Sequence, residues 1–281
     1  MSVSRVLDVV ADAAPEIRAG LPERRTKAET ENESGEAQLE ADLWADDLLY
    51  DRLADVDGVN WYGSEERADP LTVGDAEDGV AVAVDPLDGS SNVKSNNPCG
   101  TVVGVYDEPL PAPGSSLVAA AFVLYGPITT MTVARDGDVT EYLLEGGERT
   151  DLGGVELPEN PVVYGFGGRV PDWTEAFEAY VRDVEQELKL RYGGAMIADV
   201  NQVLEYGGVF GYPGLQSQAE GKLRACFESM PIAYIVETAG GASSDGTRSL
   251  LDLDPDGLHE RTPTFVGNES VIEDLEAALS D

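Results

Sequence analysis

Apolar and polar positions divide this 281-residue chain into two halves with different predicted structure. In the first half, the helical spacing of apolar residues predicts one helix at residues 3–18 and a second at 40–53. The polar stretch between them, 26–35, has no apolar period and predicts a mobile loop. Short apolar runs bounded by turn residues then predict strands at 59–63, 79–84, 101–106, 117–125 and 129–134, with a hairpin turn near Gly137.

The pattern changes after residues 145–161, a stretch rich in Gly, Pro and charge that predicts a linker between domains. A strand is expected at 162–166, and helices are expected at 172–189, 195–205 and 232–239, the last of them stopped by Gly240-Gly241. We therefore expect an α+β fold with a mostly antiparallel first half and an alternating second half. The predicted domains are residues 1–157 and 158–281, facing each other across a cleft.

The charge balance limits the classes of partner. The chain has 18 Lys and Arg against 54 Asp and Glu, a formal net charge of −36. Nucleic acids and anionic membrane surfaces attract clustered cations, so we expect neither as a partner. No apolar stretch reaches the roughly 18 residues of a membrane span and no export signal is seen, which predicts a cytoplasmic protein. Dispersed acid with only four lysines suggests a halophilic source, because such repulsion needs strong salt screening.

The most informative motif follows the apolar run at residues 80–84, which leads directly into Asp85-Pro86-Leu87-Asp88-Gly89-Ser90-Ser91-Asn92. We expect Asp85 to end a buried strand and Pro86 to fix a turn, so that the carboxylates of Asp85 and Asp88 converge on one hard cation. Backbone amides at Gly89 and Ser90 could then bind a phosphate group. The alternative is an Asx-type turn in which the serines cap a helix.

Two further motifs add charged groups. Glu65 and Glu66 follow a predicted strand, and one of them could join the aspartates; alone, such a pair is usually a solvated surface. At residues 221–228, strand alternation would place Lys222, Arg224, Cys226 and Glu228 on one face, where the two cations could bind phosphate and Glu228 could bind metal. An exposed edge strand protected by charge is the alternative for this segment.

These motifs, with Arg191-Tyr192 and residues 196–200, 204–213, 237–241 and 258–263, occur in an order that closely resembles the class I fructose-1,6-bisphosphatases of the inositol-monophosphatase and sugar-phosphatase superfamily. The resemblance implies a two-domain, layered αβαβα fold. It also implies hydrolysis of the 1-phosphate of fructose 1,6-bisphosphate with two or three Mg²⁺ or Mn²⁺ ions. The expected partners are the sugar bisphosphate and further copies of the chain, in a dimer or tetramer.

The resemblance also assigns roles to residues. The metal ligands it implies are the side chains of Glu65, Asp85, Asp88 and Glu228 and the carbonyl of Leu87. Glu66 and Asp42 would position and deprotonate the attacking water. Substrate binding would fall to Gly89, Ser90, Ser91, Asn92, Arg191, Tyr192, Tyr212, Lys222 and Arg224, and Arg191 resembles a residue that this family lends across a subunit interface.

One segment departs from the family. Where an Asn and a Tyr normally contact the distal phosphate, residues 164–170 read Tyr-Gly-Phe-Gly-Gly-Arg-Val, with Arg169 as a candidate substitute. The departure keeps open an inositol monophosphatase-like or broader sugar or nucleotide phosphatase. A non-catalytic, acidic cation-binding protein is the alternative from another class, although it leaves the Lys222 and Arg224 pair unexplained.

Overall fold

The structure is a computed structural model that describes residues 2–25, 27–31 and 37–280. The loop expected at 26–35 lies partly outside these residues. Within them, β1 (Lys27–Glu31) pairs antiparallel with β2 (Ala37–Leu39), so the loop prediction is wrong for residues 27–31. Among the described residues, none of the helices has the length and apolar character that crossing a membrane requires.

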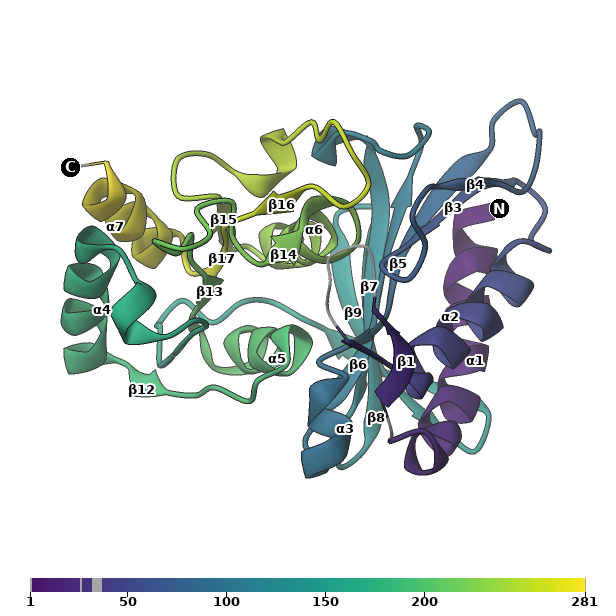
Figure 1. Ribbon diagram of the computed structural model, residues 1–281, viewed down its shortest axis with the longest axis horizontal. Coiled ribbons are helices and arrows are strands. Elements are labelled where there is room, and N and C mark those ends of the chain that lie inside the picture. The colour runs from purple at the N-terminus through teal and green to yellow at the C-terminus, as the bar shows by residue number, and fades with distance from the viewer. Residues whose placement is uncertain (1, 26, 32–36, 281) are drawn as a thin grey trace.

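The first two layers are a helix pair and a large sheet (Figure 1). Helices α1 (Ser2–Gly20) and α2 (Glu40–Leu53) cover one face of an eight-stranded sheet with the order β10-β9-β8-β7-β6-β5-β3-β4. Its strands are antiparallel except for the parallel pair β3 and β5. The strand bounds are β3 (Val59–Ser64), β4 (Leu71–Thr72), β5 (Val80–Asp88), β6 (Cys99–Tyr106), β7 (Leu117–Tyr125), β8 (Thr129–Arg135), β9 (Asp138–Glu145) and β10 (Glu148–Gly154).

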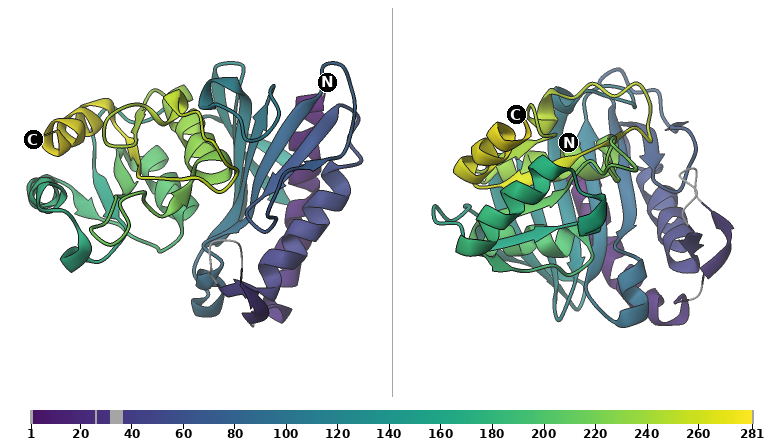
Figure 2. Two further views of the ribbon diagram at one scale, coloured as in Figure 1. Left: turned by 45° about the horizontal axis from the view of Figure 1, so that its top comes forward. Right: turned by 60° about the vertical axis from the view of Figure 1, so that its left-hand side comes forward.

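The remaining three layers follow on the other face of this sheet (Figures 1 and 2). Helices α5 (Met196–Tyr206) and α6 (Met230–Thr238) form the middle layer. A five-stranded sheet comes next, in the order β12 (Lys189–Leu190), β11 (Val163–Phe166), β13 (Gly208–Tyr212), β17 (Thr264–Gly267) and β15 (Ala242–Ser244). Helices α4 (Glu175–Glu187) and α7 (Glu269–Leu279) close the outer side. The layered αβαβα architecture is therefore confirmed.

Strand β5 explains how the layers hold together. Its side chains alternate between the two faces of the sheet, so Val82 and Val84 pack with α1 and α2 while Ala81 and Ala83 pack with the middle helices. Helix α6 is apolar on several sides because it has a sheet on each side. A continuous buried core thus joins the two halves, and the expected cleft between them is limited to a cavity lined from both sides.

The expected linker at 145–161 is wrong for its first part. Gly146 and Gly147 both have positive φ, 63° and 82°, and form the turn of a hairpin between β9 and β10. The segment resembles a linker in sequence because β10 is mostly polar and is exposed along its whole length. By contrast, the hairpin at Gly137 is confirmed, with φ of 55° at Asp136 and 86° at Gly137, values that suit a tight two-residue turn.

Candidate active site

The site begins at the C-terminal end of β5. The strand does not end at Asp85 as expected but continues to Asp88, with a register shift against β6 between these two residues. The Leu87 amide donates to Asp85 Oδ1 at 2.9 Å, and the Thr101 hydroxyl donates to the Pro86 carbonyl at 2.9 Å. This bulge lets residues three apart direct their carboxylates into one place.

A third carboxylate comes from Glu228, but not from a strand. Only β14 (Leu223–Arg224) is extended, paired with β16 (Arg261–Thr262), and residues Ala225–Ser229 form a π-helical turn that leads into α6. The Arg224 amide donates to Glu228 Oε2 at 2.7 Å, which closes this turn. The predicted strand through Cys226 is therefore wrong, and Cys226 lies in the apolar core.

Asp85, Asp88 and Glu228 form a buried carboxylate cluster. One oxygen from each lies within 4.8 Å of the others, and each residue is at most 7% exposed. Burial, followed by the charges of Glu65, Asp88 and Glu228, raises the pKa of Asp85 well above its usual value. Burial also raises the pKa of Asp88 and of Glu228 to about 7. An oxygen-only donor set with this much unfavourable charge fits a hard divalent cation.

Glu65 and Arg224 extend the cluster. The Glu65 amide donates to the Val84 carbonyl at 3.1 Å, which places Glu65 beside the end of β5. Arg224 is 2% exposed, and its Nη1 lies 2.8 Å from Glu65 Oε1 and 3.6 Å from Glu228 Oε2. A guanidinium with planar donors is thus held among carboxylates, within reach of the same space.

Glu66 and Asp42 are not among the residues that line the cavity beside this cluster. The Glu66 amide is held by the Ser64 hydroxyl at 3.2 Å, and its side chain is half-buried. Asp42 is buried in the first turn of α2. After burial, the charges of Asp88 and Asp42 raise the pKa of the Cys99 thiol to about 12, so both carboxylates lie near this thiol.

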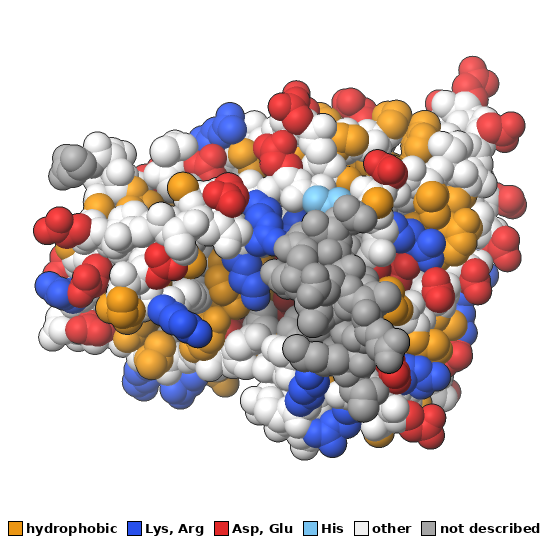
Figure 3. All heavy atoms as spheres, in the orientation of Figure 1, with side chains coloured by type: hydrophobic (Ala, Val, Ile, Leu, Met, Phe, Trp, Pro, Cys, Tyr) orange, Lys and Arg blue, Asp and Glu red, His pale blue; other side chains and the backbone are white. Residues whose placement is uncertain are grey.

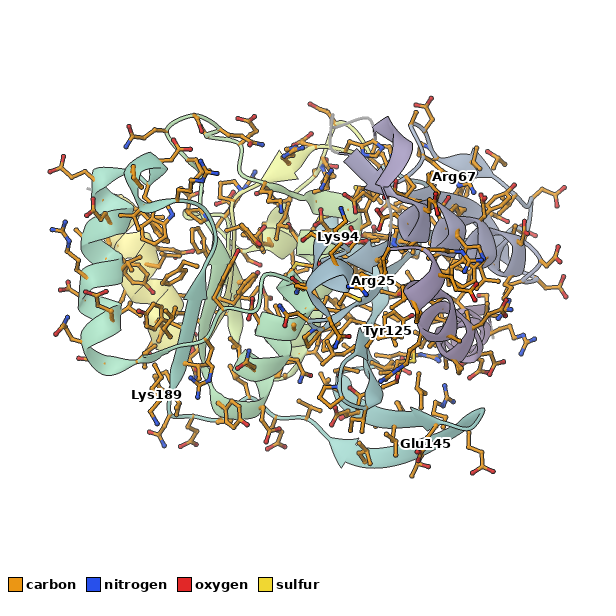
Figure 4. The ribbon with its side chains drawn as sticks, turned by 60° about the horizontal axis from the view of Figure 1, so that its bottom comes forward. Arg25, Arg67, Lys94, Tyr125, Glu145 and Lys189 are labelled. Carbon is orange, nitrogen blue, oxygen red and sulfur yellow. The ribbon has the colours of Figure 1, made fainter. Side chains whose placement is uncertain are left out.

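The segment after Asp88 turns sharply into α3 (Ser91–Ser95). Gly89 has φ of 69°, and a Cβ there would lie 2.2 Å from the Ala195 Cβ. Asn92 was expected to bind substrate, but it is not among the residues that line the cavity. Its Nδ2 instead donates to the carbonyls of Pro98 at 2.8 Å and Gly193 at 2.9 Å, which holds the turn in place. Figure 4 shows Arg25 beside Lys94 of this helix, where the guanidinium donates to the Lys94 carbonyl.

A cavity of about 200 Å³ collects most of the expected residues. Tyr212 lines it and shares a 2.9 Å hydrogen bond between hydroxyls with Tyr192, and Lys222 Nζ lies 5.3 Å from the Tyr212 ring centre. Arg191 instead lies outside, exposed, with Nη1 donating to the Leu190 carbonyl at 3.2 Å. The lining residues are Glu65, Asp85, Leu87, Asp88, Gly89, Ser90, Ser91, Gly194, Met196, Tyr212, Lys222, Leu223, Arg224 and Glu228.

The start of α5 contributes residues to the site to which the sequence motifs assigned no role. Gly194 and Met196 line the cavity, and the Ile197 amide donates to Asp88 Oδ2 at 2.9 Å. Asp199 lies behind them and is 3% exposed. The helical period contained a signal for this residue, because Asp199 falls on the same buried face as Met196 and Val203.

Comparisons with known proteins agree with this architecture. The sequence profile described as fructose-1-6-bisphosphatase, N-terminal domain, matches residues 6–151, and the C-terminal domain profile matches 157–280. A class 1 fructose-1,6-bisphosphatase of Halobacterium salinarum is 72% identical over 280 residues, which are 99% of this chain and 98% of the relative. The Natronomonas pharaonis enzyme of the same name is 62% identical over 282 residues and covers 99% of each chain.

A solved structure shows the same fold. The holo-form crystal structure of Leishmania major fructose-1,6-bisphosphatase matches with a TM-score of 0.94 and 24% identity, covering 100% of this chain and 95% of that one. Buried carboxylates beside backbone amides and cations are a type of site that binds divalent cations and phosphate groups. With both profiles matched, this chain belongs to the fructose-1,6-bisphosphatase family.

Proposed function

We propose that this protein hydrolyses the 1-phosphate of fructose 1,6-bisphosphate, with fructose 6-phosphate and phosphate as products. The observation that carries the proposal is the 72% identity to the Halobacterium salinarum enzyme over 99% of the chain. The cavity supports the proposal, because two cations, Lys222 and Arg224, line it in a protein that has three times as many acidic as basic residues. Such cations are suited to a substrate that carries two phosphate groups.

The divalent cation is proposed to be Mg²⁺, with two or three ions in the site and Mn²⁺ as a substitute. Its ligands would be the side chains of Glu65, Asp85, Asp88 and Glu228 and the Leu87 carbonyl. The raised pKa values of Asp88 and Glu228 support this assignment, because bound cations would stabilise the ionised carboxylates. When bound, such ions neutralise phosphate charge and make a water molecule more acidic.

The chain's own groups would then bind and orient the substrate. The amides of Gly89 and Ser90 and the guanidinium of Arg224 would hold the phosphate that is cleaved. Lys222, Tyr192 and Tyr212 would hold the sugar and distal phosphate. Glu66 and Asp42 would orient the attacking water and accept its proton.

Two further assignments belong to the same proposal. Residues 1–157 would form the metal- and phosphate-binding domain, and residues 158–281 would complete the sugar-phosphate site. Arg191, exposed beside Tyr192, would contact the substrate site of another subunit in a homodimer or homotetramer.

A substrate comparison tests the proposal. Phosphate release from fructose 1,6-bisphosphate and from inositol 1-phosphate is measured in molar KCl with saturating Mg²⁺. We expect the sugar bisphosphate to have the higher kcat/KM. Asp88→Asn should lower kcat by orders of magnitude, because an amide oxygen is a neutral and weaker ligand for a hard cation. Faster release from inositol 1-phosphate would contradict the substrate assignment, and no turnover of either would favour a non-catalytic cation-binding protein.

A further inference from the structure

Asp199 is a buried acid that no step of the proposed reaction uses. It lies in the first turn of α5, is 3% exposed and does not line the cavity. Its Oδ1 accepts the Gly193 amide at 2.6 Å, and the Gly194 amide also hydrogen-bonds to this side chain. Its Oδ2 is buried without a hydrogen-bond partner among the described residues. Burying an acid costs free energy, which the hydrogen bonds it accepts must offset. A role for these hydrogen bonds would explain why an acid lies at this position.

The two amides that Asp199 holds belong to a turn with several contacts. Gly194 forms part of the cavity wall and has φ of 81°, so this backbone favours glycine. The Gly193 carbonyl accepts Asn92 Nδ2 at 2.9 Å, which links the turn to residues 89–92, the segment proposed to bind phosphate. Tyr192, directly before the turn, shares its hydroxyl hydrogen bond with Tyr212.

From these contacts we infer that Asp199 is a positioning residue for the sugar end of the substrate site. It fixes the Gly193–Gly194 turn from inside the protein, and the turn sets the place of Tyr192 and of the cavity wall. The amides of Gly89 and Ser90 belong to a different segment, which follows β5 directly and which the bond from Asn92 to the Pro98 carbonyl also holds. Loss of the Asp199 contacts should therefore affect sugar binding more than phosphate binding. The inference deepens the proposed function and rests on it.

Asp199→Asn tests the inference. Asparagine keeps the shape of the side chain but replaces charge-assisted hydrogen bonds with weaker neutral ones. We expect KM for fructose 1,6-bisphosphate to rise about tenfold with kcat changed less than threefold, consistent with lost substrate binding. Measured by calorimetry, the Kd for fructose 6-phosphate should rise about tenfold, while the Kd for inorganic phosphate should stay within twofold.

Glu205→Gln is the matched control, because Glu205 is an exposed acid on the same helix, and none of these constants should change. Equal constants for Asp199→Asn and the parent would overturn the inference. So would a parallel loss of affinity for both ligands together with a lower melting temperature, which would indicate general loosening.

Hydrogen exchange in the unaltered protein provides a second test if Asp199→Asn does not fold. The amides of Gly193 and Gly194 should be protected without ligand, and rapid exchange of both would overturn the inference. This measurement needs no turnover, so it remains decisive if the parent protein fails to hydrolyse fructose 1,6-bisphosphate. That failure would count against the proposed function alone.

Discussion

At the scale of single residues, the site is defined by the electrostatic cost of its carboxylates. Asp85, Asp88 and Glu228 are buried together, and each has a raised pKa with burial as the largest cause. Arg224 offsets part of this cost, because it lowers the pKa of Glu228. A single buried guanidinium cannot neutralise four acids when Glu65 is included. The remaining negative charge is the physical reason to expect a divalent cation.

The same pKa shifts predict how stability depends on pH in metal-free protein. A carboxyl group with a raised pKa binds more protons in the folded state, so the free energy of unfolding falls as pH rises toward the folded pKa. Between pH 5.5 and 8, where ordinary carboxyl groups are already ionised, we expect a decrease of about 1.4 kcal/mol per unit of pKa shift that falls in this window. Denaturant titrations in EDTA and molar KCl would measure it.

Magnesium should reverse this trend. Because it binds the ionised carboxylates, its stabilising effect should be larger at pH 8 than at pH 5.5. Asp88→Asn provides the control, since it removes one of the titrating groups and should flatten the pH dependence of the metal-free protein. Metal-free stability that stays constant or increases over this range would contradict the prediction.

At the scale of elements, the sequence predicts helices and strands of regular periodicity, but it does not predict local departures from regular backbone geometry. Helix α2 spans residues 40–53 as expected, and β7 spans 117–125 as expected. The end of β5 was misplaced because a bulge keeps Asp85 and Asp88 in one strand despite the proline between them. The alternating residues 222–228 predict a strand, but Ala225–Ser229 form a turn whose closing bond, from the Arg224 amide to Glu228, leaves no pattern in the sequence.

The candidate site, too, was predictable from the sequence only in part. The carboxylate motifs indicated which groups come together, and the cavity does bring Glu65, Asp85, Asp88 and Glu228 to one place. The helical period placed Asp199 on a buried face, but it could not assign a role to the α5 start, because that role depends on contacts between the halves. Gly167 is a further example: a Cβ there would lie 2.0 Å from Tyr212 Cε1, and this close packing on Tyr212 is not visible in the sequence.

The close approach of Gly89 to Ala195, directly before α5, gives a prediction at this scale. Gly89→Ala would place a Cβ 2.2 Å from the Ala195 Cβ, at φ of 69°. We expect the segment to shift away from α5 and kcat/KM to fall more than tenfold, with a loss of about 1–3 kcal/mol in stability from backbone strain. Steady-state kinetics and denaturant unfolding would measure the two effects.

Gly137→Ala is the control for backbone strain without the clash. Gly137 also has a positive φ, 86°, but a Cβ there has no atom within 4 Å, and the residue lies in the hairpin between β8 and β9. It should lose stability while keeping its kcat/KM. If Gly89→Ala and Gly137→Ala had the same kcat/KM, the close approach to Ala195 would not matter for the site.

At the scale of the whole molecule, charge is the dominant feature. Pairing every one of the 18 cations with one acid would still leave 36 of the 54 acids without a cation. Figure 3 shows acidic side chains spread over the visible face. Cations are dispersed as well, and Figure 4 shows two of them, Arg67 and Lys189, at opposite sides of the molecule. Repulsion is therefore distributed over the surface and acts against the compact state.

Salt should decide whether the fold is stable. The distance over which charges act falls from about 10 Å at 0.1 M salt to about 3 Å at 1 M, so molar KCl removes most of the repulsion between separated acids. We expect the melting temperature, followed by circular dichroism, to rise by more than 10 °C between 0.1 and 2 M KCl. A gain of about 1 kcal/mol in the free energy of unfolding raises the melting temperature of a large domain by roughly 2–4 °C, so this increase corresponds to a gain of several kcal/mol. Sucrose at matched osmolality is the control, because it favours compact states without screening charge. An equal increase in sucrose, or full stability at 0.1 M KCl, would show that screening of the −36 charge is not what the fold requires.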